Sequence, residues 1–433
     1  MTRQMKNTRF HWIGDIPTDW ELIKLGYLCS LKGRIGWKGL RSDEFLENSY
    51  AYLVTGQDFI SNTVDWGACY QIEKARYDED PYIQLKEGDL LVTKDGTIGK
   101  IAKVSNLDKP ACLNSGIFVL RQTANRFDQS YLYWQLYSSL LTDYNTFVNS
   151  GASTIQHLYQ NVFERMPLIV PPLAEQKAIA EFLDEKCGEI DKLLADLDAE
   201  VKTLTEYKKS IIAETVTRGL NPNASKKSSG IEWIGEIPSN WQVLRLEYCV
   251  EEVNVKNNPI QTDFVLSLTV KDGVLPYDEK GDVGNKAKEN HADYKLAYPN
   301  TIVLNSMNIL IGAVGISKYF GCVSPVYYVL KNKENCDLRY INYILSSITF
   351  QKNLRNFAKG ILEIRLRVSA FDILKQKIPF PSLEEQIGIA NFLDKKCLEI
   401  SDAISDKIKQ LEKLKAYKSS LIYEYVTGKK QVI

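Results

Sequence analysis

Few side chains in this sequence carry reactive chemistry, and none of them stands at a catalytic or metal-binding spacing. Three histidines occur among 433 residues, at His11, His157 and His291, and no two of them are separated as zinc ligands are. The eight cysteines form no CxxC pair and are scattered along the chain: Cys29, Cys69, Cys112, Cys187, Cys249, Cys322, Cys336 and Cys397. This scatter favours reduced, buried thiols over a metal centre.

Two glycine-rich stretches imitate nucleotide-binding loops, and both fail on their spacing. In KDGTIGK, residues 94–100, Lys94 stands where a P-loop has its first glycine, and Ile101 stands where it has Ser or Thr. In GRIGWKG, residues 33–39, the glycines are spaced wrongly for a dinucleotide loop. We therefore predict a non-catalytic chain with no bound cofactor and no bound metal.

The overall charge limits what the chain can bind without local help. Lys and Arg number 54 and Asp and Glu also number 54, so the net charge is zero. A weak field gives little non-specific attraction to phosphates, and local basic clusters would have to carry any DNA contact. No apolar run approaches the roughly 20 residues that span a bilayer. We expect a cytoplasmic protein with no membrane contact.

The elements that must position these residues occur twice. WIGDIPTDW, Trp12–Trp20, returns as WIGEIPSNW, Trp233–Trp241, and the segment 173–217 returns at 383–427 without a gap. Repetition of a supersecondary unit is the signature of a duplicated architecture. We therefore expect two copies of one frame within the chain.

The second repeated segment predicts a long helix in each copy. Between Leu173 and Gly219 the only glycine is Gly188, there is no proline, and apolar residues recur in steps of four and three. The predicted seam is formed by Leu183, Cys187, Ile190, Leu194, Leu197, Val201, Leu204, Lys208 and Ile211 in the first copy and by Leu393, Cys397, Ile400, Ile404, Lys407, Leu411, Leu414, Lys418 and Leu421 in the second. A helix of about 40 residues is about 60 Å long. It needs a partner, and we expect an antiparallel coiled coil between the copies. The alternative is two helices that pack separately on their own domains.

The number of identical residues in the two copies varies along the predicted helices. Leu173–Cys187 shares ten of fifteen residues with its copy, and Tyr207–Thr217 shares seven of eleven, but Asp191–Glu206 shares only two of sixteen. The middle segment keeps the spacing of its apolar residues in both copies, but the residues themselves differ. We infer a packing stalk in the middle and docking ends on both sides.

Each helix follows a globular stretch in which strands and turns precede a helix. The fold class expected is α+β, with two mixed α/β domains joined by two long helices in an antiparallel coiled coil and a pseudo-two-fold internal repeat. The predicted segments are a first domain at 1–170, a first helix at 171–219, a linker at 220–230, a second domain at 231–378 and a second helix at 379–433.

The combination of these motifs resembles a known family. Two WIGxIPxxW segments, two helices that open with PPLAEQKAIAEFLDEK and PSLEEQIGIANFLDKK, and divergent domains between them resemble the specificity subunit of type I restriction-modification enzymes. The resemblance covers essentially the whole chain, and the order and doubling of the short motifs make it specific.

The resemblance implies a non-catalytic reader of double-stranded DNA. In that family each domain recognises one half of a split site, the paired helices act as a spacer, and they also dock two modification (methyltransferase) subunits. Two restriction (motor-nuclease) subunits then join the complex. S-adenosylmethionine, ATP and magnesium belong to those partners. Because the two domains differ in sequence, the two half-sites should differ as well.

Polar and basic residues in turns are the candidates for DNA contact, since such side chains reach base edges and phosphates. The predicted contacts in the first domain are Arg34, Lys38, Arg41, Lys94, Thr97, Lys100, Gln156 and His157. The predicted contacts in the second domain are Lys271, Asn305, Ser306, Asn308, Lys318, Arg365 and Arg367.

A second class of function remains open on the sequence alone. A coiled-coil adaptor that bridges two protein partners and never touches DNA would fit the neutral charge. A self-contained restriction enzyme or methyltransferase is disfavoured, because the motifs that either would need are missing.

Overall fold

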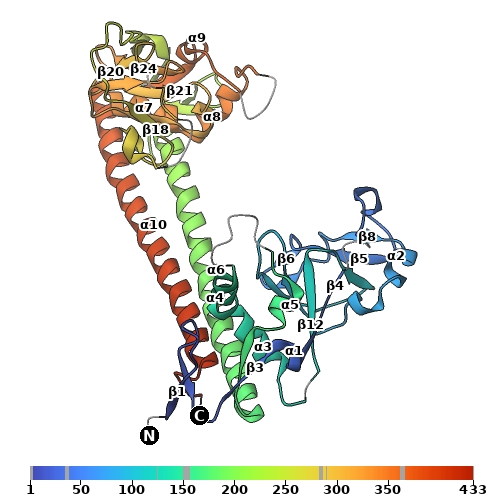
Figure 1. Ribbon diagram of the computed structural model, residues 1–433. Coiled ribbons are helices and arrows are strands. Elements are labelled where there is room, and N and C mark those ends of the chain that lie inside the picture. Colours follow the sequence, from blue (N-terminus) through green and yellow to red (C-terminus); the bar gives the residue numbers. More distant parts are fainter. Residues whose placement is uncertain are drawn as a thin grey trace. The chain divides into compact units, whose positions relative to one another are not determined.

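The computed structural model describes residues 3–34, 39–123, 125–149, 157–281, 286–288, 290–360 and 366–432. The chain forms two compact units, one made of Met1–Leu197 with Gln410–Ile433 and the other of Asp198–Lys409. Two long helices, α6 (Leu173–Arg218) and α10 (Leu383–Val426), each contribute to both units. Each unit therefore holds one globular domain, the first part of its own helix and the last part of the other (Figure 1).

The first domain is built on a six-stranded sheet. Its order is β4 (Cys29–Gly33), β12 (Ile117–Gln122), β9 (Leu90–Thr93), β10 (Ile101–Lys103), β7 (Thr63–Val64) and β6 (Phe59–Ile60). A second sheet follows the order β11 (Ala111–Leu113), β5 (Ala51–Val54) and β8 (Tyr70–Ile72). Strands such as β9, whose four residues are all buried, read as continuous apolar runs because both of their faces are covered.

The second domain repeats the centre of this sheet. Its four antiparallel strands run in the order β17 (Val250–Glu252), β24 (Tyr327–Asn332), β21 (Ile302–Asn305) and β22 (Val314–Ile316), which matches β4, β12, β9 and β10. Two hairpins are added, β18 (Leu266–Thr269) with β19 (Gly273–Pro276) and β20 (Lys295–Ala297) with β23 (Gly321–Val323). The frame is shared and the additions differ.

A pair of short helices follows each sheet, and serine breaks each pair. These are α3 (Gln129–Tyr137) and α4 (Ser139–Val148) in the first domain and α7 (Leu338–Ser346) and α8 (Ile348–Arg355) in the second. The hydroxyl of Ser138 accepts a hydrogen bond from Leu140 N, and that of Ser347 accepts one from Phe350 N. A capping hydroxyl satisfies the free amides of the new helix, so the predicted single helix becomes two.

The repeat begins earlier than the tryptophan motif. Strand β1 (Met5–Asn7) pairs with β2 (Asp15–Pro17), and β14 (Lys226–Ser228) pairs with β15 (Glu236–Pro238) in the same register. Three residues of the predicted linker 220–230 form strand β14. Two further ribbons are duplicated, β3 (Glu21–Lys24) with β13 (Pro167–Val170) and β16 (Gln242–Arg245) with β25 (Lys377–Phe380).

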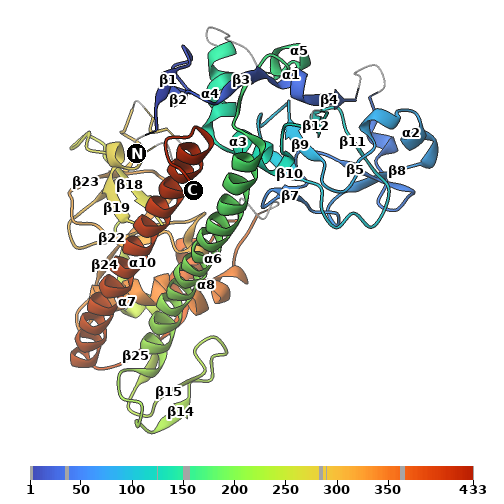
Figure 2. The same ribbon diagram turned by 90° about the horizontal axis from the view of Figure 1, so that it is seen from below.

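Helices α6 and α10 pack antiparallel within each unit, as Figures 1 and 2 show. In the first unit the Phe182 and Tyr425 rings are 4.4 Å apart and Lys418 Nζ is 2.6 Å from Asp191 Oδ1. In the second unit Lys208 Nζ donates to Ser401 Oγ at 2.6 Å, and Lys407 pairs with Glu200. Every predicted seam residue is buried or half-buried. The coiled-coil prediction is confirmed, and separately packed helices are ruled out.

The Lys418 and Asp191 pair gives a first testable prediction. Lys418 is 8% exposed, and its Nζ lies 2.6 and 2.7 Å from the two oxygens of Asp191. Asp191→Ala should lower the free energy of unfolding by about 1–2 kcal/mol, because it leaves a buried ammonium uncompensated next to a half-exposed site. Lys418→Met should be close to neutral, because a volume-matched apolar side chain suits the seam. Urea unfolding compares them, and a larger loss for Lys418→Met would contradict the argument.

The retained ends of the helices dock on the tryptophan motifs. Trp20 Nε1 donates to Glu175 Oε2 at 2.9 Å, and Trp241 Nε1 donates to Glu385 Oε1 at 3.1 Å. Both indoles are fully buried. A buried indole N–H needs an acceptor, so the helix must begin with a glutamate at this position.

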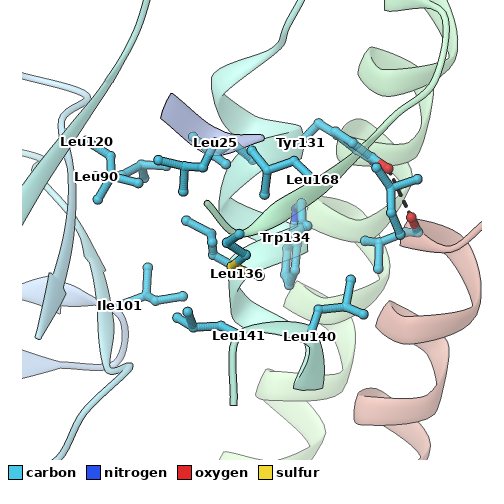
Figure 3. Close-up of a cluster of buried hydrophobic side chains, with 14 of the residues drawn as sticks. Leu25, Leu90, Ile101, Leu120, Tyr131, Trp134, Leu136, Leu140, Leu141 and Leu168 are labelled. Atoms are coloured by element: carbon cyan, nitrogen blue, oxygen red, sulfur yellow. Dashed lines mark hydrogen bonds between the residues drawn. The ribbon is translucent and has the colours of Figure 1, made fainter. Parts of the chain in front are cut away.

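A tyrosine in each domain holds the last turn of the opposite long helix. Tyr131 OH donates to Val426 O at 3.0 Å in the first unit, and in the second Tyr340 OH shares its proton between Val216 O at 3.2 Å and Pro379 O at 3.0 Å. Figure 3 shows Tyr131 in the apolar cluster of the first unit, with its hydroxyl bonded to the end of the neighbouring helix. The docking ends inferred from the repeat are thus contacts within each unit.

All eight cysteines are buried. Burial raises the pKa of the Cys29 thiol to about 12 and that of Cys112, Cys187 and Cys322 to about 11. Among the residues that the structure describes, no group of three or more His, Cys, Asp and Glu side chains is placed to hold a metal ion. Over the same residues, no helix combines the length and apolar character needed to cross a bilayer.

Candidate nucleic-acid interface

One edge of the first sheet collects the glycine-rich segments. Because β4, β12, β9 and β10 are antiparallel neighbours, the end of β4, the start of β12, the end of β9 and the start of β10 lie at the same edge. The chain leaves β4 there at Gly33 and Arg34, and the turn 94–100 joins β9 to β10. The first two residues of one glycine-rich segment and the whole of the other therefore lie at one edge.

The turn 94–100 is held by the threonine that ends β9. Thr93 Oγ1 donates to Thr97 O at 2.5 Å and accepts from Lys100 N at 2.9 Å. Gly96 and Gly99 have φ of 68° and 82°, which other residues rarely adopt. Thr97 and Lys100 are exposed, and Lys94 is half-buried with its Nζ 4.9 Å from the centre of the Phe118 ring. The turn therefore presents two lysines and a hydroxyl on a rigid base.

His157 joins this turn from a distant segment. Leu158 N donates to Lys94 O at 3.0 Å, and His157 Nδ1 pairs with Asp95. The imidazole lies 4.6 Å from the Tyr159 ring, which is 60% exposed. The structure thus brings together Lys94, Thr97, Lys100 and His157, as four polar groups at the edge of one sheet.

Arg34 and Arg41 do not join this group. Arg34 is 2% exposed, and its Nε donates to Leu113 O at 2.9 Å, so it holds two sheets together and offers no guanidinium to solvent. Arg41 is exposed, but its backbone belongs to the turn before Glu44, beside the core of the smaller sheet. Lys38 and Gln156 lie outside the described residues.

The second domain repeats the backbone of this edge with other side chains. Lys94 N donates to Gly116 O at 2.8 Å, and Ser306 N donates to Val326 O at 3.4 Å. Val368 N donates to Ser306 O at 3.1 Å, in the way that Leu158 N donates to Lys94 O. Ser306 therefore occupies the position of Lys94. The sequence did not reveal this correspondence, because Thr93 and Lys94 differ from Asn305 and Ser306 at both positions.

A cleft of about 680 Å³ opens at this edge of the second domain. Its lining includes Lys271 from the β18–β19 turn, Asn305 from the end of β21, and Asn308. Three predicted residues are thus brought together. The sequence reasoning missed Tyr277, Lys280, Lys286 and Tyr327, which also line the cleft. Aromatic residues near lysines in a variable domain are the signal that would have found them.

The other predicted residues of the second domain that the structure describes do not line the cleft. Ser306 is 3% exposed and acts through its backbone. Lys318 is exposed beyond the far end of β22 and lines a different hollow. Arg367 is exposed, and its backbone pairs with that of Lys359 next to Val368. Arg365 lies outside the described residues.

Comparisons with known proteins agree with this architecture. The model of the type I restriction modification DNA specificity domain matches the chain twice, over residues 17–203 and 238–413. The type I restriction enzyme MjaVIII specificity subunit of Methanocaldococcus jannaschii is 28% identical, over 96% of this chain and 94% of its own length. The EcoBI specificity subunit of Escherichia coli is 24% identical, over 70% of this chain and 66% of its own.

Two solved structures share the fold. A chain from a study of complex assembly and conformational transition in a type I R-M system has a TM-score of 0.67 at 14% identity, and the match covers 96% of this chain and 99% of that one. The HsdS subunit from Thermoanaerobacter tengcongensis has a TM-score of 0.50 at 16% identity, with 96% and 98% covered.

Proposed function

Because this chain belongs to the family of type I restriction-modification specificity subunits, we propose that its two domains read the two halves of an asymmetric split DNA site. The chain is a non-catalytic DNA-recognition subunit of a restriction-modification complex. The adaptor without DNA contact is not favoured. The proposal adds how the recognition is divided between the domains.

One observation carries this division. The same backbone frame occurs at one edge of both sheets, with Thr93 and Lys94 in the first domain where the second has Asn305 and Ser306. A duplicated frame positions the polar groups, and the different side chains on it read different bases. Two unlike displays on one frame therefore support two unlike half-sites.

The described residues give each domain a proposed contact surface. The first surface consists of Lys94, Thr97, Lys100 and His157, and the second of Lys271, Asn305, Asn308 and Arg367. Arg34 and Ser306 are left out because their side chains are buried and do not line the cleft of the second domain, whereas Asn305, which is also buried, is kept because it lines the cleft. Lys38, Gln156 and Arg365 remain sequence predictions, as do Arg41 and Lys318, which lie apart from the two surfaces.

The two long helices supply the proposed docking sites for two modification subunits. Five polar positions beside the seam carry the same residue in α6 and in α10. They are Lys186, Glu189, Tyr207, Ser210 and Glu214 on α6 and Lys396, Glu399, Tyr417, Ser420 and Glu424 on α10. Tyr207 and Tyr417 are 51% and 54% exposed. Packing within the chain does not explain why exposed tyrosines are retained twice, so two copies of one partner are the proposed reason.

The remaining partners follow from the same proposal. Two restriction subunits complete the complex, and S-adenosylmethionine, ATP and magnesium are bound by those partner subunits. The target is chromosomal or invading double-stranded DNA, which places the complex in the cytoplasm.

Methylation mapping tests the proposal directly. The chain is co-expressed with its modification subunit in a host without other methyltransferases, and methylated adenines are located by single-molecule sequencing. We expect one sequence with two unlike defined parts separated by unspecified bases. A palindromic site, or a site with one continuous defined part, would contradict the division between the domains.

The lysines of the first surface give a second prediction. Lys94→Ala with Lys100→Ala should reduce the slope of log affinity against log salt by about 2, because each phosphate contact contributes about 0.9. Binding of the complex to a duplex that carries its mapped site is measured by fluorescence anisotropy at several salt concentrations. The control is Lys24→Ala, since Lys24 is exposed on β3, which pairs with β13 and is not part of the six-stranded sheet. An unchanged slope in the double variant would remove these lysines from the interface.

A further inference from the structure

The cleft of the second domain has the size of a binding pocket. The side chains that line it come from the β18–β19 hairpin, the end of β21 and the start of β24. Its volume of about 680 Å³ lies in the range of small-molecule pockets. It therefore has room for a group that enters it, and its position at the proposed DNA-binding edge limits which group that is.

Asn305 lines this cleft, and only the oxygen of its side-chain amide has a hydrogen-bond partner within the described part of the chain. The side chain is 5% exposed, and its Oδ1 accepts a hydrogen bond from Met307 N at 3.0 Å. Within the described part of the chain, Asn305 Nδ2 has no hydrogen-bond partner. Although the residue as a whole is largely buried, this nitrogen stays in contact with solvent, and Asn305 lines the cleft. The cleft thus offers one hydrogen-bond donor that a ligand can satisfy in place of water.

The first domain shows what a purely structural residue does at the same position. Thr93 is 2% exposed, and its hydroxyl both donates to Thr97 O and accepts from Lys100 N. Its hydrogen bonds are closed within the turn. Only the second domain leaves a donor open at this point of the shared frame.

Tyrosines and lysines form part of the lining of the cleft. Tyr277 OH accepts from Ala287 N at 2.9 Å, and Tyr294 OH accepts from Lys288 N at 3.1 Å, so the two phenols hold the segment 286–288 at the rim. Lys280 Nζ lies 4.2 Å from the centre of the Tyr277 ring. Tyr327 is half-buried in the wall. Aromatic rings and cations in the same lining suit a flat aromatic group attached to phosphates.

We propose that this cleft takes one nucleobase that has left the DNA stack, an inference that rests on the proposed reading of a half-site by this domain. A base in the stack presents its edge to side chains that protrude into a groove. Asn305 does not protrude, so only a base turned out of the helix reaches its Nδ2. The amide donates to a ring nitrogen or carbonyl of that base, Tyr327 stacks on it, and Lys271 and Lys286 bind the flanking phosphates.

The test uses the complex of the full chain with its modification subunit. Duplexes that carry the mapped site have 2-aminopurine at one position at a time across the second half-site, because the fluorescence of this base rises when it unstacks. We expect a several-fold rise at one position other than the methylated adenine. We also expect about tenfold tighter binding when that position is mismatched, since a mismatched base costs less to extrude.

Two variants and one control assign the rise to the cleft. Asn305→Asp keeps an oxygen for Met307 N and removes the amide donor, and Tyr327→Leu removes the stacking face without touching the hydrogen bond. Both should abolish the rise at that position. Asn300→Asp makes the same chemical change at an exposed residue before the opposite end of β21 and should leave the rise intact.

The outcomes separate this inference from the proposed function. Sequence-selective binding in which no position of the second half-site shows a rise that Asn305→Asp or Tyr327→Leu removes would overturn the inference and leave the proposed function standing. Absence of sequence-selective binding would overturn both. Free deoxynucleoside monophosphates could also bind to the cleft as tightly as the duplex does, and lose that binding in Asn305→Asp. That result would overturn the inference, because the ligand would then be a free nucleotide and not DNA.

Discussion

Gly428→Ala is expected to lower the stability of the first unit by about 3 kcal/mol. Gly428 follows α10 with φ of 71°, a conformation that costs a residue with a Cβ about 1–2 kcal/mol. An added Cβ would lie 2.5 Å from Pro17 Cδ and 2.8 Å from Trp20 Cη2. Trp20 is fully buried and bonded to Glu175, so it does not move aside cheaply. The added methyl group would therefore disrupt the packing of the last turn of α10 against the first domain.

Two other glycines are matched controls for this change. Gly188 lies inside α6 with open space around it, and Gly188→Ala should stabilise the chain by up to about 1 kcal/mol through helix propensity. Gly219 has φ of 73°, and an added Cβ would lie 3.0 Å from Trp241 Cζ2, so Gly219→Ala should fall between the other two. The urea midpoint should be highest for Gly188→Ala and should then fall in the order wild type, Gly219→Ala and Gly428→Ala. A Gly428→Ala midpoint at or above that of Gly219→Ala would contradict the steric argument.

A four-residue insertion in both long helices should separate the two half-sites by one or two further base pairs. The insertions follow Leu197 in α6 and Lys409 in α10, so that each opposes the other in the antiparallel pair. Four residues add about 6 Å and turn a helix by about 40° beyond one full turn. A DNA base pair advances by about 3.4 Å and turns by about 35°. The inserted residues therefore lengthen and rotate the helix pair by amounts that one or two added base pairs can match in the DNA.

Methylation mapping reads the result of the insertion. We expect both defined parts of the site to be unchanged, the unspecified stretch to be longer, and methylation of the original site to fall at least tenfold. The control inserts two residues at the same points, which turns each helix by about 200° and carries the seam to the wrong face. That variant should lose the coiled coil and methylate no site. An altered sequence in either half, with the spacing unchanged, would contradict the spacer role.

The sequence determined the frame, because the frame depends on local and periodic signals. The seam of α6 and α10 follows from the spacing of Leu183, Cys187 and their successors, and the helix partner follows from the repetition of that spacing. The divergence of Asp191–Glu206 and the retention of the helix ends separated the packing stalk from the docking ends. No long-range information was needed for these conclusions.

The identity of the docking contacts required the tertiary structure. Tyr131 and Val426 are 295 positions apart, and nothing in either local sequence marks the hydrogen bond between them. The same holds for Trp20 and Glu175, whose retention in both copies showed that they matter without showing what they touch. Retention within a repeat identifies a constraint, and only the fold identifies its partner.

The candidate site was decided mainly by the tertiary structure. Arg34 and Lys94 looked alike as basic residues in glycine-rich turns, but the packing of two sheets buries Arg34 while the edge of one sheet presents Lys94. The cleft around Asn305 is lined by segments that meet only when the β18–β19 hairpin packs against β21 and β24. Helix periodicity acts over a few residues and is written in the sequence, whereas burial and cleft formation depend on segments that arrive from far along the chain.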